Sequence, residues 1–114
     1  MRFKRIYGST SDRTLVANLM NVGWPDNIVF HLAATLGVKN VIEHPLETLE
    51  NNIHGTENVL KAAAKLDRPV FIASSSEVYG KSDAVPFLET GDLTLGNPSI
   101  ARWGYAASKI LDEF

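Results

Sequence analysis

Hydrophobic residues gather in two unbroken runs, NIVFHLAA at 27–34 and PVFIASSS at 69–76. Each run has the length of a strand and is rich in β-branched and aromatic residues, a pattern typical of strands buried on both faces of a parallel sheet. A third, shorter strand is predicted for FKRIY at 3–7.

Helical spacing of apolar residues predicts helices over 12–20, 46–66 and from about 105 onward. Asp12 is well placed to cap the first of these helices. The segment TLGVKNVIEHP at 35–45 is interpreted as connecting chain or a short helix. A long loop with several prolines and glycines is expected over 77–102.

Strands and helices therefore alternate, which predicts an α/β protein with a parallel sheet and right-handed crossovers. The two strong strands run directly into small residues, in HLAAT at 31–35 and ASSSE at 73–77. In open α/β sheets, ligands bind just beyond the carboxyl ends of the strands. Short side chains at these two places would let a ligand approach the backbone closely.

The chain has 114 residues, a formal net charge of −2 and no cysteine. Its length fits one domain at most, and disulfides and cysteine-based metal sites are excluded. The charge offers no basic face for nucleic acid or a membrane surface, and no apolar run approaches a membrane span. We therefore expect a cytoplasmic protein. We also expect no metal site, because His44 and His54 stand at no metal-ligand spacing. His31, within a buried-strand pattern, is interpreted as structural.

Tyr105 and Lys109 stand four residues apart in YAASK, so a helix would place them on one face. The ordinary pKa of a tyrosine hydroxyl, about 10, is too high for a base at neutral pH. A neighbouring ammonium favours the phenolate and lowers that pKa, so the pair fits a general base. Taken alone, the spacing more often reflects an exposed tyrosine beside a solvated lysine.

Four motifs change that weighting. They are FHLAA at 30–34, NNIHGTENVL at 51–60, SSSEVYG at 74–80 and YAASK at 105–109. In this order and spacing the chain resembles the extended short-chain dehydrogenase/reductase family, the nucleotide-sugar epimerases, dehydratases and decarboxylases. The resemblance covers essentially the whole chain. It implies a partial Rossmann-type, doubly wound parallel sheet with flanking helices.

The resemblance also implies roles for the matched residues. Tyr105 would take the proton from the sugar 4-hydroxyl, while Lys109 would lower the tyrosine pKa and hold the nicotinamide ribose. Ser75 would hydrogen-bond the reacting oxygen, and Asn52 would help order the proton relay. Hydride would pass from sugar C4 to NAD, leaving a 4-keto sugar. The implied cofactor-binding residues are Leu32, Ala33, Ala34, Ser74, Tyr105 and Lys109.

Ser76 and Glu77 bear on the step after oxidation. Family dehydratases that act on dTDP-glucose usually carry Asp-Glu here, whereas Ser-Glu is more similar to UDP-glucuronate decarboxylases and GDP-mannose dehydratases. Arg102 and Trp103, in ARWGY, resemble the decarboxylase domains of bacterial lipid A modification and of plant apiose/xylose synthases. Glu77 would then act after oxidation, although a solvated loop acid is an equally open interpretation of the residue alone.

The chain also departs from the family pattern. It holds no G-x-G-x-x-G or G-x-x-G-x-x-G motif, so the phosphate-binding turn, its helix and the acidic residue about twenty positions later are missing. By resemblance, the strand at 3–7 would be the family's third, which leaves strands one and two absent from the order 3-2-1-4-5-6. We therefore expect residues 1–114 to form an incomplete NAD-binding Rossmann-like domain without a substrate domain.

Three functional hypotheses stay open at this point. The first is part of an NAD-dependent nucleotide-sugar enzyme, inactive as 114 residues alone and forming a homodimer or higher oligomer in its parent. The second is a truncated, non-catalytic relative that serves as a binding or assembly module. The third is a generic α/β domain with chance motifs. Ser75, Tyr105 and Lys109 together favour the first; which sugar is used, and whether epimerisation, dehydration or decarboxylation follows, is left open.

Overall fold

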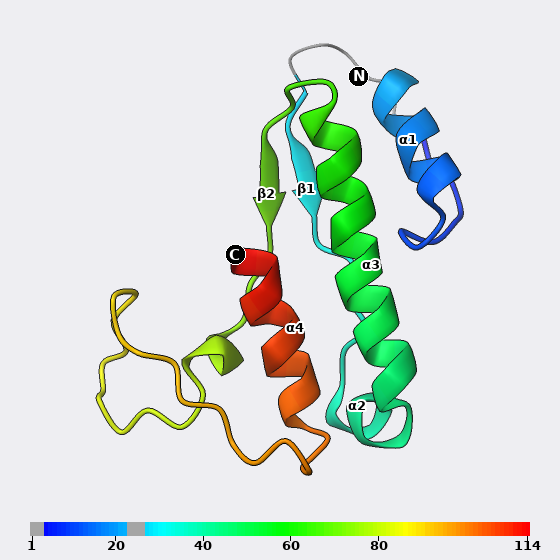
Figure 1. Ribbon diagram of the computed structural model, residues 1–114. Coiled ribbons are helices and arrows are strands. Elements are labelled where there is room, and N and C mark those ends of the chain that lie inside the picture. The colour runs from blue at the N-terminus through cyan, green and yellow to red at the C-terminus, as the bar shows by residue number, and fades with distance from the viewer. Residues whose placement is uncertain (1–3, 23–26) are drawn as a thin grey trace.

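The computed structural model describes residues 4–22 and 27–114. The elements, in chain order, are α1 (Arg13–Val22), β1 (Val29–His31), α2 (Val38–Glu43), α3 (Pro45–Ala64), β2 (Val70–Ile72), the 3₁₀ helix η1 (Ser76–Tyr79) and α4 (Trp103–Glu113). Figure 1 shows the long helix α3 lying along the two strands, with α1 on one side of it and α4 on the other. None of the described helices is long and apolar enough to cross a membrane.

β1 and β2 are parallel, with Phe30 opposite Phe71 in the register. The helix α3 connects them, so the three elements form the β-α-β unit that the sequence predicts. The core lies where α1, α3 and one face of the sheet meet. It consists of Val16, Met20, Val59 and Ala62, with Val29 and Val70 packed against them. The prediction of an α/β fold with a parallel sheet and flanking helices is confirmed.

The expectation that both strands are buried on both faces is wrong. Phe30 is 64% exposed and Phe71 54% exposed, and their rings contact each other with centroids 5.5 Å apart. Side chains alternate between the faces of a strand, so Val29 packs in the core while Phe30 points to the other face. Each strand also has only three residues. The second face of the sheet has no helix layer among the described residues, so only one face of each apolar strand is buried in the core.

The predicted strand at 3–7 is also wrong for its described part. Residues 4–7 have no strand structure, and Ile6 and Tyr7 are exposed; Phe3 lies outside the described residues. A strand exists only where its backbone groups bond to a neighbouring strand. In the described part of the chain, β1 and β2 bond to each other and leave this segment without such a neighbour.

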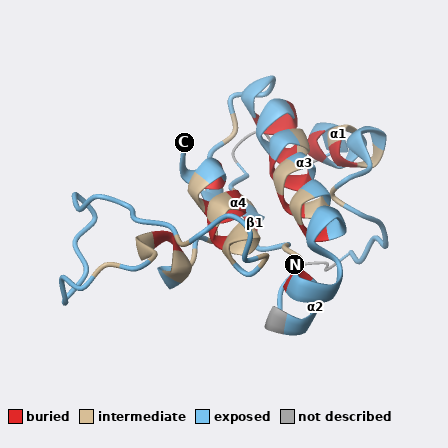
Figure 2. Cartoon of the chain, turned by 60° about the horizontal axis from the view of Figure 1, so that its bottom comes forward, coloured by how far each residue is buried: buried red, intermediate tan, exposed pale blue. Residues whose placement is uncertain are grey.

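The helix boundaries follow local chemistry closely. Asp12 caps α1, since its Oδ1 accepts a hydrogen bond from the backbone N–H of Leu15 at 2.9 Å. α3 begins at Pro45, a residue suited to the first turn of a helix. The segment at 35–45, which was ambiguous in sequence, contains the short helix α2. Figure 2 shows that the buried positions of α3 and α4 lie inside the molecule, whereas the loop over 80–102 is mostly exposed.

The start of that loop depends on Gly80. Its φ is 61°, and a Cβ at this position would lie 2.3 Å from the carbonyl oxygen of Thr94. The same oxygen accepts a hydrogen bond from the N–H of Lys81 at 2.8 Å. Only glycine tolerates both the backbone conformation and this close approach. The contact closes residues 80–94 into a loop and leaves a short segment that leads into α4.

Candidate functional site

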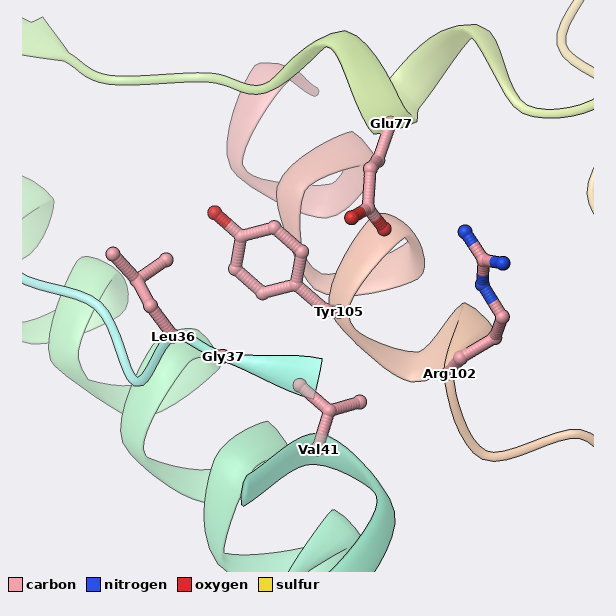
Figure 3. A pocket seen from close by; sticks show the side chains of 6 residues that line it. All are labelled: Leu36, Gly37, Val41, Glu77, Arg102 and Tyr105. Carbon is pink, nitrogen blue, oxygen red and sulfur yellow. The ribbon is translucent and has the colours of Figure 1, made fainter. Parts of the chain in front are cut away.

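A cavity of about 200 Å³ lies where η1, α2 and α4 approach one another. Its lining consists of Leu36, Gly37, Val41, Glu77, Arg102 and Tyr105. Figure 3 shows that the polar side chains come from two places, Glu77 from η1 and the other two from the start of α4, while the apolar side comes from the chain around α2. The sequence prediction that Tyr105 and Glu77 belong to one site is consistent with this placement.

Lys109 lies one turn after Tyr105 on α4, as the sequence predicts, but its ammonium has another partner. Its Nζ lies 2.9 Å from Oδ2 of Asp112, and the side chains of both residues are almost completely buried. A buried ion pair of this kind is costly to break from one side, because the remaining charge would be left without compensation. The expectation that the ammonium acts on Tyr105 therefore stays a prediction, with Asp112 as a competing partner.

His31 shares this buried region and has a structural role. Its Nε2 lies 3.0 Å from Oγ1 of Thr56, and the residue is only 4% exposed. Burial lowers the pKa of His31, the positive charge of Lys109 lowers it further, and the negative charge of Asp112 partly opposes both effects. The imidazole is therefore neutral near pH 7 and serves as a hydrogen-bonding group between β1 and α3.

The lowered pKa of His31 predicts that acidification destabilises the fold. The unfolded chain takes up a proton near the ordinary pKa of 6.5, whereas the folded state resists protonation. Stability is therefore complete above pH 6.5 and is lost as the pH falls toward the lower folded-state pKa. Urea unfolding at about pH 7.5 and about pH 5.5 measures the difference. His31→Gln should reduce the difference in unfolding free energy between the two pH values, whereas the exposed control His44→Gln should keep it. The same pH-dependent difference in both variants would contradict this account.

Asn52 joins the end of β1 to α4. Its Oδ1 accepts a hydrogen bond from the backbone N–H of Thr35 at 2.7 Å, and its Nδ2 lies 3.4 Å from Oγ of Ser108. Ser108 in turn donates to the carbonyl oxygen of Tyr105 at 2.8 Å. Asn52 is 2% exposed and Ser108 fully buried. These contacts hold the first turn of α4 against the strand end, while the proton-relay role of Asn52 stays a prediction.

The serines after β2 do not line the cavity that holds Tyr105. Oγ of Ser75 accepts a hydrogen bond from the N–H of Glu77 at 3.2 Å and so caps η1, and the hydroxyl of Ser74 donates to Glu113. Both serines line a neighbouring cavity of about 640 Å³. Ser75 caps η1 and Glu77 stands two positions later; at three residues per turn these two side chains point in different directions.

Two of the expected cofactor residues lie in a third cleft. Ala33 and Ala34, followed by Thr35, line a cleft of about 250 Å³ at the carboxyl end of β1. The facing wall is the loop 8–10, which Asn58 fixes by donating to the carbonyl oxygen of Thr10 at 3.0 Å. Small side chains and exposed backbone suit a flat or sugar-like group. Leu32 is 63% exposed, and Lys109 is buried away from the surface.

Sequence reasoning missed three residues that organise the site. Ser108 lies within the YAASK motif, Thr35 directly follows HLAA, and Asp112 stands three residues after Lys109. Asp112 could have been recognised from the sequence, because an acid three residues from a lysine on a helix commonly pairs with it. The other two are small polar residues inside motifs, and only their burial shows that they bond to the scaffold.

Comparison with known proteins places these features in a family. The whole chain, residues 1–114, matches the GDP-mannose 4,6 dehydratase family. The chain belongs to this family. Among curated relatives, the UDP-N-acetyl-alpha-D-glucosaminuronate decarboxylase of Bacillus cytotoxicus is 45% identical over 105 residues, which is 92% of this chain and 32% of that protein. The UDP-glucose 4-epimerase of Mycoplasma pneumoniae is 37% identical over 91 residues, 78% of this chain and 26% of that protein.

Solved structures agree with the family assignment. Pal from Bacillus thuringiensis matches with a TM-score of 0.78 and 30% identity, over 95% of this chain and 33% of that one. The UDP-glucose 4-epimerase of Bifidobacterium longum, in complex with NAD⁺ and UDP, matches with a TM-score of 0.80 and 26% identity, over 99% of this chain and 32% of that one. The chain thus spans about a third of these relatives. The resemblance to nucleotide-sugar enzymes and the partial Rossmann-type fold are confirmed.

Proposed function

We propose that this chain is the part of an NAD-dependent nucleotide-sugar enzyme that oxidises the sugar at C4. The observation that carries the proposal is the cavity on which Tyr105 and Glu77 converge from α4 and η1. Family membership supports the enzyme class, since relatives are named as decarboxylases and epimerases of UDP-sugars. The NAD⁺ and UDP in the Bifidobacterium longum structure support the proposed cofactor and substrate class.

In this proposal Tyr105 is the base, and its hydroxyl oxygen accepts the proton of the sugar 4-hydroxyl. Ser75, which follows β2 and caps η1, would have to turn its hydroxyl from the neighbouring cavity to hydrogen-bond the reacting oxygen. Asn52 would keep the first turn of α4 in position through Ser108. Lys109 would keep Asp112 and use its remaining N–H donors for the ribose hydroxyls of the cofactor. By fixing the position of Tyr105, Asn52 would preserve the geometry on which the proton transfer depends.

The described residues fit one part of a nicotinamide cofactor. Ala33 and Ala34 leave the cleft beyond β1 open, and the loop 8–10 forms its opposite wall. When bound, NAD would supply the two-electron acceptor for the hydride of C4. The residues of this chain would bind it and exclude water from the reacting atoms. Residues 1–114 would thus be one section of an NAD-binding domain, too incomplete to be active alone.

The reaction after oxidation is proposed to be similar to that of a UDP-glucuronate decarboxylase. A sugar with a carboxylate beside a C4 ketone is a β-keto acid, which loses carbon dioxide readily. Such a site needs little beyond oxidation and positioning. The 45% identity to the UDP-N-acetyl-alpha-D-glucosaminuronate decarboxylase of Bacillus cytotoxicus supports this choice.

A non-catalytic binding or assembly module is the second candidate. The exposed pair Phe30 and Phe71 favours it, because contiguous apolar surface on a sheet invites a covering partner. An assay separates the two candidates: the full-length protein that carries this sequence should form NADH when mixed with NAD and a UDP-sugar. Absence of both NADH in a single turnover and any converted sugar, with every UDP-sugar and with folding retained, would favour the module.

Glu77→Gln tests the role of Glu77 after oxidation. If Glu77 acts only in the second step, the first hydride transfer survives and NADH accumulates, because the following step stalls. Single-turnover absorbance of NADH, read together with product formation, measures both steps. Glu43→Gln, an exposed acid at the end of α2, is the matched control. Normal product formation by the Glu77 variant would show that Glu77 is only a solvated acid.

A further inference from the structure

We propose that Arg102 is a specificity-determining residue that binds a carboxylate on the sugar, so that the substrate is a nucleotide-linked uronic acid. The inference rests on the proposed function of the same cavity. Arg102 lines that cavity together with Tyr105 and Glu77 (Figure 3). It is the cation among the six lining residues, so it is the group there that can attract an anionic substituent.

The position of Arg102 follows from the helix. Arg102 directly precedes the first residue of α4 and has helical backbone angles, φ −54° and ψ −29°. It therefore lies three residues before Tyr105 on one helical face, a spacing that brings Cβ atoms to about 5–6 Å. In a hexuronic acid the 4-hydroxyl and the carboxylate stand on adjacent ring carbons. Two side chains that contact these groups must start from neighbouring positions, and the helix positions of Arg102 and Tyr105 meet that condition.

The guanidinium is oriented and free to receive an anion. It lies 5.2 Å from the ring centroid of Trp103, a cation–π contact that restrains a planar group without consuming its hydrogen-bond donors. Within the described ranges, the ion pairs are those of Lys61, His54 and Lys109, and none involves Arg102. A guanidinium in this state can bind a carboxylate through two parallel hydrogen bonds.

Electrostatics explains why a uronic acid needs this residue. Glu77 lines the same cavity, so an acidic sugar that enters it meets a carboxylate of like charge. Arg102 supplies the opposite charge in the same cavity and offsets that repulsion. A neutral hexose gains nothing from the arginine. The difference in affinity between an acidic and a neutral sugar is therefore expected to depend on Arg102.

The test compares UDP-glucuronate with UDP-glucose in the full-length protein that carries this sequence. Dissociation constants for both compounds are measured in the presence of NAD, and NADH formation is followed separately. The variants are Arg102→Gln, which removes the charge, and Arg102→Lys, which keeps the charge but loses the paired hydrogen bonds. Lys81→Gln is the matched control, because its ammonium also lies over the Trp103 ring, at 5.8 Å, but does not line the cavity.

We expect wild-type protein to prefer UDP-glucuronate, and Arg102→Gln to weaken its binding about 10- to 100-fold, the usual range for a hydrogen bond to a charged group. Arg102→Lys should fall between the two, and UDP-glucose binding and the Lys81 control should not change. A preference for UDP-glucuronate that survives in Arg102→Gln, or no preference in wild type, overturns the inference. If the acid preference depends on Arg102 but neither NADH in the first turnover nor a converted sugar forms, the inference stands and the proposed oxidation fails.

Discussion

Tyr105→Phe is expected to slow NADH formation about 10²- to 10⁴-fold, the range that a positioned general base contributes. The change keeps the ring, which fills part of the cavity with Leu36 and Val41, and removes only the hydroxyl that would accept the sugar proton. The loss falls on the transition state, so nucleotide-sugar affinity should change little. Single-turnover absorbance of NADH measures the rate, and calorimetry measures the affinity.

Tyr7→Phe is the matched control for this experiment. Tyr7 is 83% exposed, and its hydroxyl accepts a hydrogen bond from Arg5 rather than from a residue of the cavity. The Tyr7→Phe substitution removes the same hydroxyl from the same residue type, but outside the cavity. The variant should therefore form NADH at the wild-type rate. A Tyr105→Phe enzyme that reduces NAD at nearly the normal rate would remove Tyr105 from the mechanism.

Asn52→Leu is expected to lower the free energy of unfolding by about 2–4 kcal/mol, since two hydrogen-bonded groups lose their partner inside the fold. The N–H of Thr35 and the hydroxyl of Ser108 both bond to the Asn52 amide, and leucine has a similar size but offers neither bond. Urea unfolding measures the change. The first turn of α4 should also loosen, because Ser108 bonds to Tyr105.

Asn21→Leu serves as the control for Asn52. Asn21 is exposed and makes a hydrogen bond to the carbonyl oxygen of Ala17 on its own helix. Substitutions at such surface positions usually change stability by less than about 0.5 kcal/mol. Equal effects of the two substitutions would show that Asn52 does not connect β1 to α4 in the way that its contacts indicate.

Local signals in the sequence predicted the helices α1, α3 and α4 and the alternation of β1, α3 and β2. Asp12 marks the start of α1, and Tyr105 and Lys109 lie on one helix as their spacing requires. The alternation of apolar runs and helical patterns predicted the parallel pair β1–β2. Each helix and each strand depends on residues close together in the chain, and the pairing follows from the order of these elements, which is why both can be recognised without knowledge of the fold.

Features that depend on distant residues were not predictable. Residues 4–7 have the composition of a strand but no described neighbour to pair with, and Phe30 remains exposed because no described helix covers its face. Sequence reasoning also missed the partner of Lys109, because Asp112 stands one turn away just as Tyr105 does. Burial favours Asp112 over Tyr105 as the partner of Lys109, because an ammonium removed from water binds most strongly to a carboxylate.

The position of the hydrogen that is removed from the sugar tests the central claim most directly. The full-length protein that carries this sequence is mixed with NAD and UDP-glucuronate deuterated at C4, quenched during the first turnover, and its nucleotide is analysed by mass spectrometry. Oxidation at C4 predicts that the deuterium appears in the reduced nicotinamide, and that Tyr105→Phe prevents this transfer. Reduced nicotinamide without deuterium, or conversion of the sugar with no deuterated nicotinamide at any time in the first turnover, would contradict oxidation at C4.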